Sequence, residues 1–291
     1  MNRTFLSRAG RVAGGVVAAW ALWACATANS PAVLTALQDF GAAPLVLIGE
    51  QHDADAHQQV QAQAVARLVA HGQLGALALE MAQAPHHTVG LPSDASPAQV
   101  RATLQWDDAG WPWERYSAAV MHAVRAGVPV HGVNLAREQL RAAMADAALD
   151  RRLDAQALAT QQQAVRAGHC GLLPESQIAP ITRVQIARDA QMAQSLAQLS
   201  SNTPDKTVLL LAGTGHVRRD VGITALMRRS GDAAQARLAD SARVLWLVAG
   251  DGTPPEAALG GTDRVLQTPA PPPADYCAGL RERFRPREQT P

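Results

Sequence analysis

Short apolar runs alternate with amphipathic stretches along most of this 291-residue chain, and this alternation constrains the fold more than any other feature. The stretches repeat apolar residues at the spacing of an amphipathic helix, and strands separated by helices form parallel sheets. We therefore predict an α/β fold with a mainly parallel central sheet, flanking helices and a helical insertion. The apolar runs predicted as strands are 44–49, 75–81, 128–133, 206–212 and 243–249.

The connections between these strands are predicted from helical periodicity and from residues that break helices. Asp53 or Asp55 can cap the first helix. The segment 82–112 is rich in Pro, His and Asp and predicts a loop, and the prolines at 269–273 predict a polyproline-like C-terminal tail. The predicted helices cover about 55–71, 113–126, 178–198 and 221–229.

Polar side chains follow the predicted strands at the point where each strand ends. The first strand leads to Glu50 and His52, the second to Glu80, the third to Asn134 and the fourth to His216. Because parallel strands end at one edge of the sheet, where open α/β sheets bind ligands, we expect these side chains to meet there. Histidines and glutamates together can bind a divalent metal or perform acid–base chemistry. The alternative is that each polar residue only caps the following helix.

An aromatic segment precedes the third strand and contains Trp111, Trp113 and Tyr116. Aromatic side chains can form a flat apolar wall for a planar ligand. They can equally anchor a loop that packs onto the sheet. His86 and His87 lie in the preceding loop, where they can ligate iron or remain solvated.

The helix predicted around 178–198 carries a polar stripe. Gln185, Arg188, Asp189 and Met192 are spaced i, i+3, i+4 and i+7, which places them on one side of the helix. If this side faces the sheet edge, Arg188 can hold a ligand carboxylate and Asp189 can orient a histidine. If it faces water, it is an ordinary charged helix surface.

The first 25 residues have the pattern of a signal peptide, with three arginines before a short apolar stretch. The stretch ends in Leu22-Trp23-Ala24-Cys25, which resembles a bacterial lipobox. We predict a signal peptide over 1–25, a lipid on Cys25, and a single α/β domain over 26–291. The protein would then be anchored in the bacterial cell envelope, at the outer membrane facing the periplasm. Ala26-Thr27-Ala28 offers an ordinary cleavage site instead.

Two further cysteines, Cys170 and Cys277, remain for the exported part of the chain. In an oxidising compartment such a pair favours a disulfide over two buried thiols.

The charge pattern argues against nucleic-acid binding. The net charge is +1, Lys206 is the only lysine, and no helix carries a dense basic stripe. The sequence leaves a homodimer open.

Several of these segments, taken in order over about residues 40–250, resemble the ChaN-type haem-binding lipoproteins, in a wider grouping with Tiki/TraB proteins and erythromycin esterases. The lipobox-like segment fits the same family. The segments are Gly49-Glu50-Gln51-His52-Asp53, Glu80-Met81, Trp111-Pro112-Trp113-x-x-Tyr116, Gln185-x-x-Arg188-Asp189-x-x-Met192-Ala193, and Gly215-His216-Val217 followed by Gly222-Ile223.

The resemblance implies an exported α/β protein that binds haem for iron uptake. It also implies an ancestral pocket of Glu50, His52, Glu80 and His216, which serves metal or acid–base chemistry in hydrolytic relatives. The alternative function is therefore a hydrolase that uses these four residues, with or without a divalent metal.

Haem iron is commonly held by His or Tyr. Tyr116 is the first choice for the iron ligand because a phenolate suits ferric iron, and His86 and His87 follow it. If Tyr116 packs inward and Tyr276 is tied down beside a bridged Cys277, we expect the tyrosine-ligand hypothesis to fail.

Overall fold

The computed structural model describes residues 31–40, 42–261 and 263–283. The predicted signal peptide and the predicted lipid attachment at Cys25 lie outside these ranges. Within them, no helix has the length and apolar character needed to cross a membrane.

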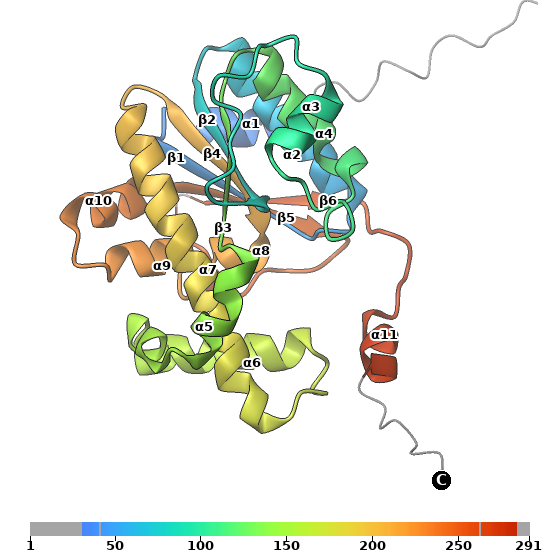
Figure 1. Ribbon diagram of the computed structural model, residues 1–291, viewed down its shortest axis with the longest axis vertical. Coiled ribbons are helices and arrows are strands. Elements are labelled where there is room, and N and C mark those ends of the chain that lie inside the picture. Colours follow the sequence, from blue (N-terminus) through green and yellow to red (C-terminus); the bar gives the residue numbers. More distant parts are fainter. Residues whose placement is uncertain (1–30, 41, 262, 284–291) are drawn as a thin grey trace, which may run out of the picture.

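The described residues form one six-stranded parallel sheet with the order β3-β2-β4-β1-β5-β6 (Figure 1). This confirms the predicted α/β fold with a parallel central sheet, and five of the strands are the predicted apolar runs. The sixth, β6, pairs with β5 at one edge of the sheet and was not predicted. The strands are β1 (Leu45–Glu50), β2 (Leu74–Gln83), β3 (Val130–Asn134), β4 (Thr207–Gly213), β5 (Arg243–Ala249) and β6 (Arg264–Thr268).

Helices cover both faces of the sheet (Figure 1). The buried residues of α1, α2 and α4 pack on one face, and those of α7, α9 and α10 pack on the other. The helices are α1 (Pro31–Phe40), α2 (Asp55–Ala70), α3 (Pro97–Thr103), α4 (Trp113–Arg125), α5 (Leu140–Ala145), α6 (Ala155–Gly168), α7 (Glu175–Asn202), α8 (Thr214–Val217), α9 (Ile223–Arg228), α10 (Ala233–Ser241) and α11 (Tyr276–Arg283).

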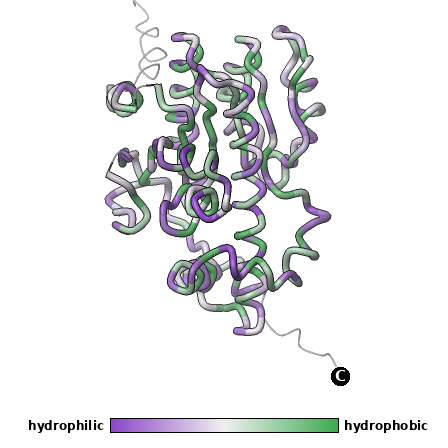
Figure 2. The backbone as a smooth tube through the Cα atoms, turned by 90° about the vertical axis from the view of Figure 1, so that its left-hand side faces the viewer, coloured by the Kyte–Doolittle hydropathy of each residue, from purple (hydrophilic) through white to green (hydrophobic). Residues whose placement is uncertain are grey.

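The core explains why the central strands are continuous apolar runs. In β1, Val46 and Ile48 pack into the cluster under α2 and α4, whereas Leu45 and Leu47 pack into the cluster under α7 and α9. Successive side chains of a strand point to opposite faces, so a strand covered on both faces must be apolar throughout. Figure 2 shows the hydrophobic colour along the central strands.

Two local predictions were wrong. The N-cap of α2 is Ala54, with no side-chain hydrogen bond, so neither Asp53 nor Asp55 caps this helix. The predicted loop at 82–112 contains α3, which begins with a capping box between Ser96 and Gln99 and has Pro97 in its first turn. These signals favour a helix start and could have located α3 from the sequence.

Candidate functional site

The sheet brings the polar strand ends together at its carboxyl edge. Glu50, the last residue of β1, is the register partner of Gly213, the last residue of β4. Glu80 comes from β2 on the other side of β4, and His216 comes from α8, which follows β4 directly. The structure therefore places Glu50, His52, Glu80 and His216 in one region, as parallel pairing predicted.

Glu50 is 1% exposed and accepts three side-chain hydrogen bonds. The Tyr116 hydroxyl donates to Oε1 over 2.7 Å, and His52 Nδ1 lies 2.7 Å from the same oxygen. Gln58 Nε2 donates to Oε2 over 2.6 Å. Donors of this number stabilise a carboxylate that has been removed from water. Burial and the neighbouring Glu50 raise the pKa of Tyr116, so its phenol stays protonated.

Glu80 is the centre of a second buried group. It accepts from the Gly213 backbone N–H over 2.7 Å and lies 3.1 Å from His216 Nε2. The other ring nitrogen, Nδ1, is 2.5 Å from Asp189. The predicted role of Asp189 in orienting a histidine therefore matches the contact in the structure. The Asn134 side chain donates to the Glu80 backbone oxygen over 2.9 Å and fixes the end of β3 against β2.

The second group carries buried charges. Burial opposes ionisation of Glu80, but the charge and hydrogen bond of His216, the charge of His52 and the Gly213 N–H together outweigh it and lower the pKa to about 2. Burial also disfavours the charged form of His216, but Glu80 and Asp189 together raise its pKa well above the usual value. Burial raises the pKa of Asp189, and the attraction to His216 offsets part of this rise. The pair of Glu80 and His216 is therefore an ion pair at neutral pH.

Gly213 allows the two groups to approach each other. A Cβ atom at this position would lie 2.8 Å from His52 Nε2 and 3.5 Å from Glu80 Oε2. The His52 ring therefore rests on the backbone of β4, between the two glutamates. Burial lowers the pKa of His52, but its hydrogen bond to Glu50 and the charge of Glu80 reverse this and raise it.

A cavity of about 940 Å³ opens outside the ends of β1, β4 and β5. His52 and Thr214 lie on its inner side, and Gln51, Asp53 and Arg115 supply polar atoms. The volume is in the range of small-molecule sites, and the position is the usual one for ligands of open α/β sheets. Its apolar and aromatic lining includes Trp111, Pro112, Trp246, Leu247, Val248, Pro254, Pro255 and Tyr276.

Trp111 is held as part of the cavity wall. Its ring meets His52 edge-on, with the ring centroids 4.6 Å apart. The Trp106 indole N–H donates to the Trp111 backbone oxygen over 2.7 Å. Arg115 donates to the His52 backbone oxygen over 3.1 Å and pairs with Asp55. The wall therefore has a fixed backbone, which favours binding of a rigid ligand with little ordering cost.

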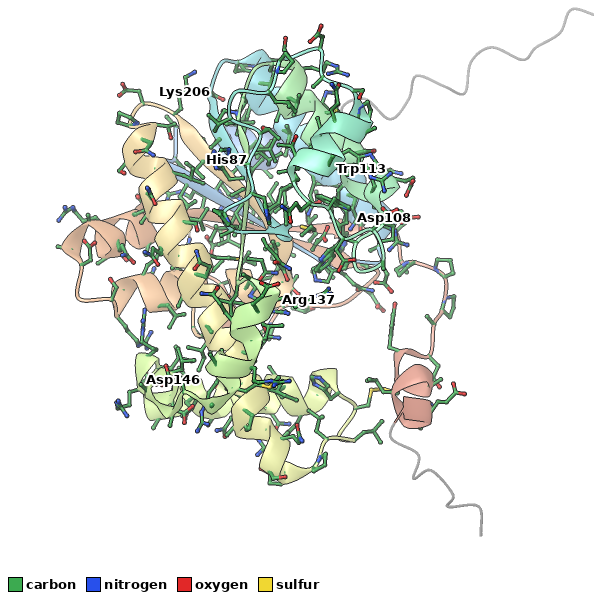
Figure 3. All side chains as sticks on the ribbon, viewed as in Figure 1. His87, Asp108, Trp113, Arg137, Asp146 and Lys206 are labelled. Atoms are coloured by element: carbon green, nitrogen blue, oxygen red, sulfur yellow. A yellow bond between two sulfur atoms is a disulfide. The ribbon has the colours of Figure 1, made fainter. Side chains whose placement is uncertain are left out.

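Tyr116 and Trp113 do not have the predicted roles. Tyr116 touches the cavity, but its side chain is 1% exposed and its hydroxyl is committed to Glu50, so it cannot reach a haem iron. Trp113 lies on α4 (Figure 3), is 5% exposed and packs edge-on against Trp106. It is a packing anchor and does not line the cavity.

The other proposed haem contacts also lie elsewhere. His86 and His87 follow β2, and His87 packs against His131 of β3, with the ring centroids 5.5 Å apart. Neither lines the cavity, and neither does Arg188. The Arg188 Nε atom is buried, and within the described residues it has no hydrogen-bond partner.

The four clustered residues are not arranged as a metal centre. Among the described residues, no group of three or more His, Cys, Asp and Glu side chains is placed to hold a metal ion. Each nitrogen of His216 faces a carboxylate, and His52 faces Glu50 and Gly213. The donors are thus directed at one another and form a charge network beneath the cavity, so the metal site predicted from these four residues is not found among the described residues.

Two residues of the C-terminal part were not predicted as cavity residues. Trp246 is in β5, and Tyr276 begins α11. The Cys170–Cys277 disulfide expected from the sequence is present, with an S–S distance of 1.96 Å. Tyr276 therefore does lie beside a bridged cysteine, but its side chain is 57% exposed and lines the cavity.

A second cavity, of about 1140 Å³, lies between α2 and α4 and shares Pro112 and Arg115 with the first. It contains Gln58 but none of Glu50, His52, Glu80 or His216. The first cavity is therefore the better candidate site, because it adjoins the charge network.

The chain was compared with curated proteins and with solved structures. The sequence matches no curated protein. A solved structure described as cofacial heme binding to ChaN of Campylobacter jejuni is 20% identical, with a TM-score of 0.56, over 75% of this chain and 86% of that one. A structure of the type III effector HopBA1 is 16% identical, with a TM-score of 0.46, over 80% of this chain and 92% of that one.

The likeness to the Campylobacter structure concerns the fold. A family model covers more than half of the chain, from residue 36 to residue 227. This span includes Glu50, His52, Glu80 and His216 and ends before Tyr276. The chain therefore belongs to the family described as haem-binding uptake, Tiki superfamily, ChaN.

Proposed function

We propose that this protein binds haem in the 940 Å³ cavity at the carboxyl edge of the sheet. The observation that carries the proposal is the combination of family membership with an aromatic, apolar cavity beside the family-matched strand ends. The ChaN structure from Campylobacter jejuni, which has the same fold, is described as binding heme.

The lining fits a haem group by its chemistry. Trp111 and the Pro254–Pro255 pair supply flat apolar surface for a macrocycle. Arg115 and Thr214 supply donors at the polar side, and an arginine is a good partner for a propionate carboxylate. The buried network of Glu50 and Glu80 supports His52 at the inner side and needs no direct contact with the ligand.

Two tryptophan substitutions test which cavity takes haem. Ala249 lines the proposed cavity and Ala66 lines the other, and both side chains are half-buried. We expect Ala249→Trp to weaken a haemin titration, followed at the Soret band, by about tenfold or more, which is at least ~1.4 kcal/mol. Ala66→Trp is the matched control and should leave binding unchanged. Equal loss in both variants, or loss only in Ala66→Trp, would contradict this location.

We further propose that the protein is exported and lipid-anchored through Cys25, where it takes part in haem uptake for iron supply. The Cys170–Cys277 disulfide supports this, because such bonds persist in oxidising compartments. Metabolic labelling with a radioactive fatty acid should mark the wild-type protein and not a Cys25→Ala variant. Label in both proteins would exclude Cys25 as the anchor. A homodimer stays a prediction, which size-exclusion chromatography with and without haemin would test.

A further inference from the structure

Helix α11 has almost no packing of its own. Among its residues whose burial is described, 276–282, only Cys277 and Leu280 are half-buried and the rest are exposed. Figure 1 shows α11 set apart from the sheet and its helices, at the end of an extended segment that follows β6. Burial of apolar area is the main stabilising contribution to a docked helix, so α11 must depend on other contacts to hold its place.

Among the described residues, a disulfide and the side chain of Tyr276 attach α11 to the rest of the protein. The disulfide joins Cys277 to Cys170, which lies in the turn after α6, and the bond is visible beside α11 in Figure 3. One residue before Cys277, the Tyr276 hydroxyl accepts from Gln51 Nε2 over 3.2 Å. A hydrogen bond with Asp53 also raises the pKa of the Tyr276 phenol. Gln51 and Asp53 directly follow β1, so α11 is attached at the mouth of the cavity.

Of the residues that line the cavity, Tyr276 is the best placed to ligate the iron of a haem bound there. Among the described lining residues, Tyr116, His52 and Tyr276 have the side chains that commonly ligate haem. The Tyr116 hydroxyl is buried on Glu50. His52 has Nδ1 on Glu50 and Nε2 against Gly213. Tyr276 is the most exposed of the three, at 57%, whereas the His52 side chain is 40% exposed and has its Nδ1 on Glu50.

We propose that Tyr276 is the iron ligand of the bound haem, and that the Cys170–Cys277 disulfide positions it. This inference rests on the proposed haem function and adds the identity of the ligand and a redox dependence. It also revises the expectation that a bridge beside Tyr276 removes it from this role, because the bridge holds the ring at the cavity.

The proposal involves two chemical changes, ligation of the iron by Tyr276 and reduction of the disulfide. On ligation the phenol O–H bond breaks, an oxygen–iron bond forms, and the proton leaves to water past the Asp53 carboxylate, with the iron remaining ferric. On reduction, an external dithiol transfers two electrons and two protons to the disulfide, which gives the thiols of Cys170 and Cys277 and an oxidised dithiol. Helix α11 then loses its covalent attachment, and Tyr276 is no longer held at the cavity.

The test uses the mature protein, exported with its own N-terminal segment so that the disulfide can form. Haemin is titrated into the wild type, a Tyr276→Phe variant and a Cys170→Ser/Cys277→Ser double variant. We expect both variants to keep the wild-type circular dichroism spectrum. We expect both to bind haemin about tenfold or more weakly and to lose the phenolate-to-iron charge-transfer band.

Reduction of the wild type provides an independent arm. The protein is treated with a dithiol, alkylated and freed of reagent before titration, and the double serine variant is treated in the same way as the control. We expect the treatment to weaken binding by the wild type to the level of the double variant, and to leave the double variant unchanged.

The outcomes separate this inference from the proposed function. Haemin binding by the wild type with the same affinity and spectrum in Tyr276→Phe would overturn the ligand assignment and leave haem binding intact. Wild-type affinity and spectrum in the double serine variant would overturn the positioning role of the disulfide. A wild type without saturable binding would overturn the proposed function, and this inference with it.

Discussion

The contact between Gly213 and His52 gives the sharpest prediction of the site. Replacing Gly213 with alanine places a Cβ atom 2.8 Å from His52 Nε2 and 2.9 Å from Cε1, closer than real Cβ contacts allow. The backbone of Gly213 has φ −62° and ψ 150°, which alanine adopts without strain. The effect of Gly213→Ala is therefore purely steric, and the His52 ring must move.

The size of the effect follows from what His52 loses. Overpacking in a filled region costs about 1–3 kcal/mol, and a hydrogen bond to a charged group contributes about 1.5–3 kcal/mol. Because His52 is partly exposed, it can swing out and give up its bond to Glu50, so the two costs do not add in full. We expect Gly213→Ala to lower the free energy of unfolding by about 2 kcal/mol, or roughly 4–8 °C in Tm.

Gly215 is the matched control for this experiment. It lies two residues away in α8, and a Cβ atom there meets nothing within 4 Å. Urea unfolding should show Gly215→Ala unchanged or slightly stabilised, and haemin titration should show weaker binding only for Gly213→Ala. Equal stability and equal haemin affinity of the two variants would refute the position assigned to His52.

Three further predictions concern the buried groups and the disulfide. Tyr116→Phe should lower the free energy of unfolding in urea by about 1–2 kcal/mol, through loss of one bond to Glu50, and should leave the haemin spectrum unchanged; a changed Soret band would contradict the inward position of Tyr116. Glu80 has a folded pKa of about 2, lowered from 4.5. Its contribution to the free energy of unfolding, on the order of 3 kcal/mol, is therefore present above pH 4.5 and lost as the pH falls towards 2. The pKa of His216 is raised, so its contribution is present below pH 6.5 and lost at higher pH. Stability measured against pH should therefore differ most between wild type and Glu80→Gln from about pH 4.5 to 6.5, and parallel curves would contradict the ion pair. The Cys170→Ser/Cys277→Ser variant should lower the free energy of unfolding by much less than the ~4–5 kcal/mol of the chain-entropy model, because α11 can detach from a protein that stays folded. If urea unfolding shows loss of the full amount, α11 is well packed.

The sheet was predictable because its central strands are buried on both faces. Such strands must be continuous apolar runs, and β1, β2, β4 and β5 are all of this kind. The missed strand β6 alternates half-buried and exposed residues at the edge of the sheet, so it carries no comparable apolar signal.

The polar cluster was predictable for a topological reason. Parallel pairing alone places Glu50, Glu80 and His216 at one edge, whatever the details of packing. The direction of Tyr116 depended instead on which side of α4 faces the core. Tyr116 shares the spacing i, i+3, i+4 and i+7 with Ala119, Val120 and Ala123, all of which are buried, so this apolar stripe could have shown that Tyr116 points inward.

The cavity itself could not be predicted from local patterns. Tyr276 and Gln51 are 225 positions apart in the chain, and their contact depends on the path of the segment after β6. The sequence predicted the Cys170–Cys277 pair from the compartment and the cysteine count, but nothing in it placed the neighbouring Tyr276 at the mouth of the cavity.

The loose attachment of α11 has a consequence for how proteins of this kind can diverge. The helix follows the family-matched span, which ends at residue 227, and contributes almost nothing to the buried core. Substitutions at exposed positions usually change stability by less than about 0.5 kcal/mol. A residue such as Tyr276 can therefore be exchanged, or the segment lengthened, while the sheet and its charge network are retained. The side chain offered to a ligand at this cavity is thus free to vary under selection separately from the scaffold that forms the rest of the pocket.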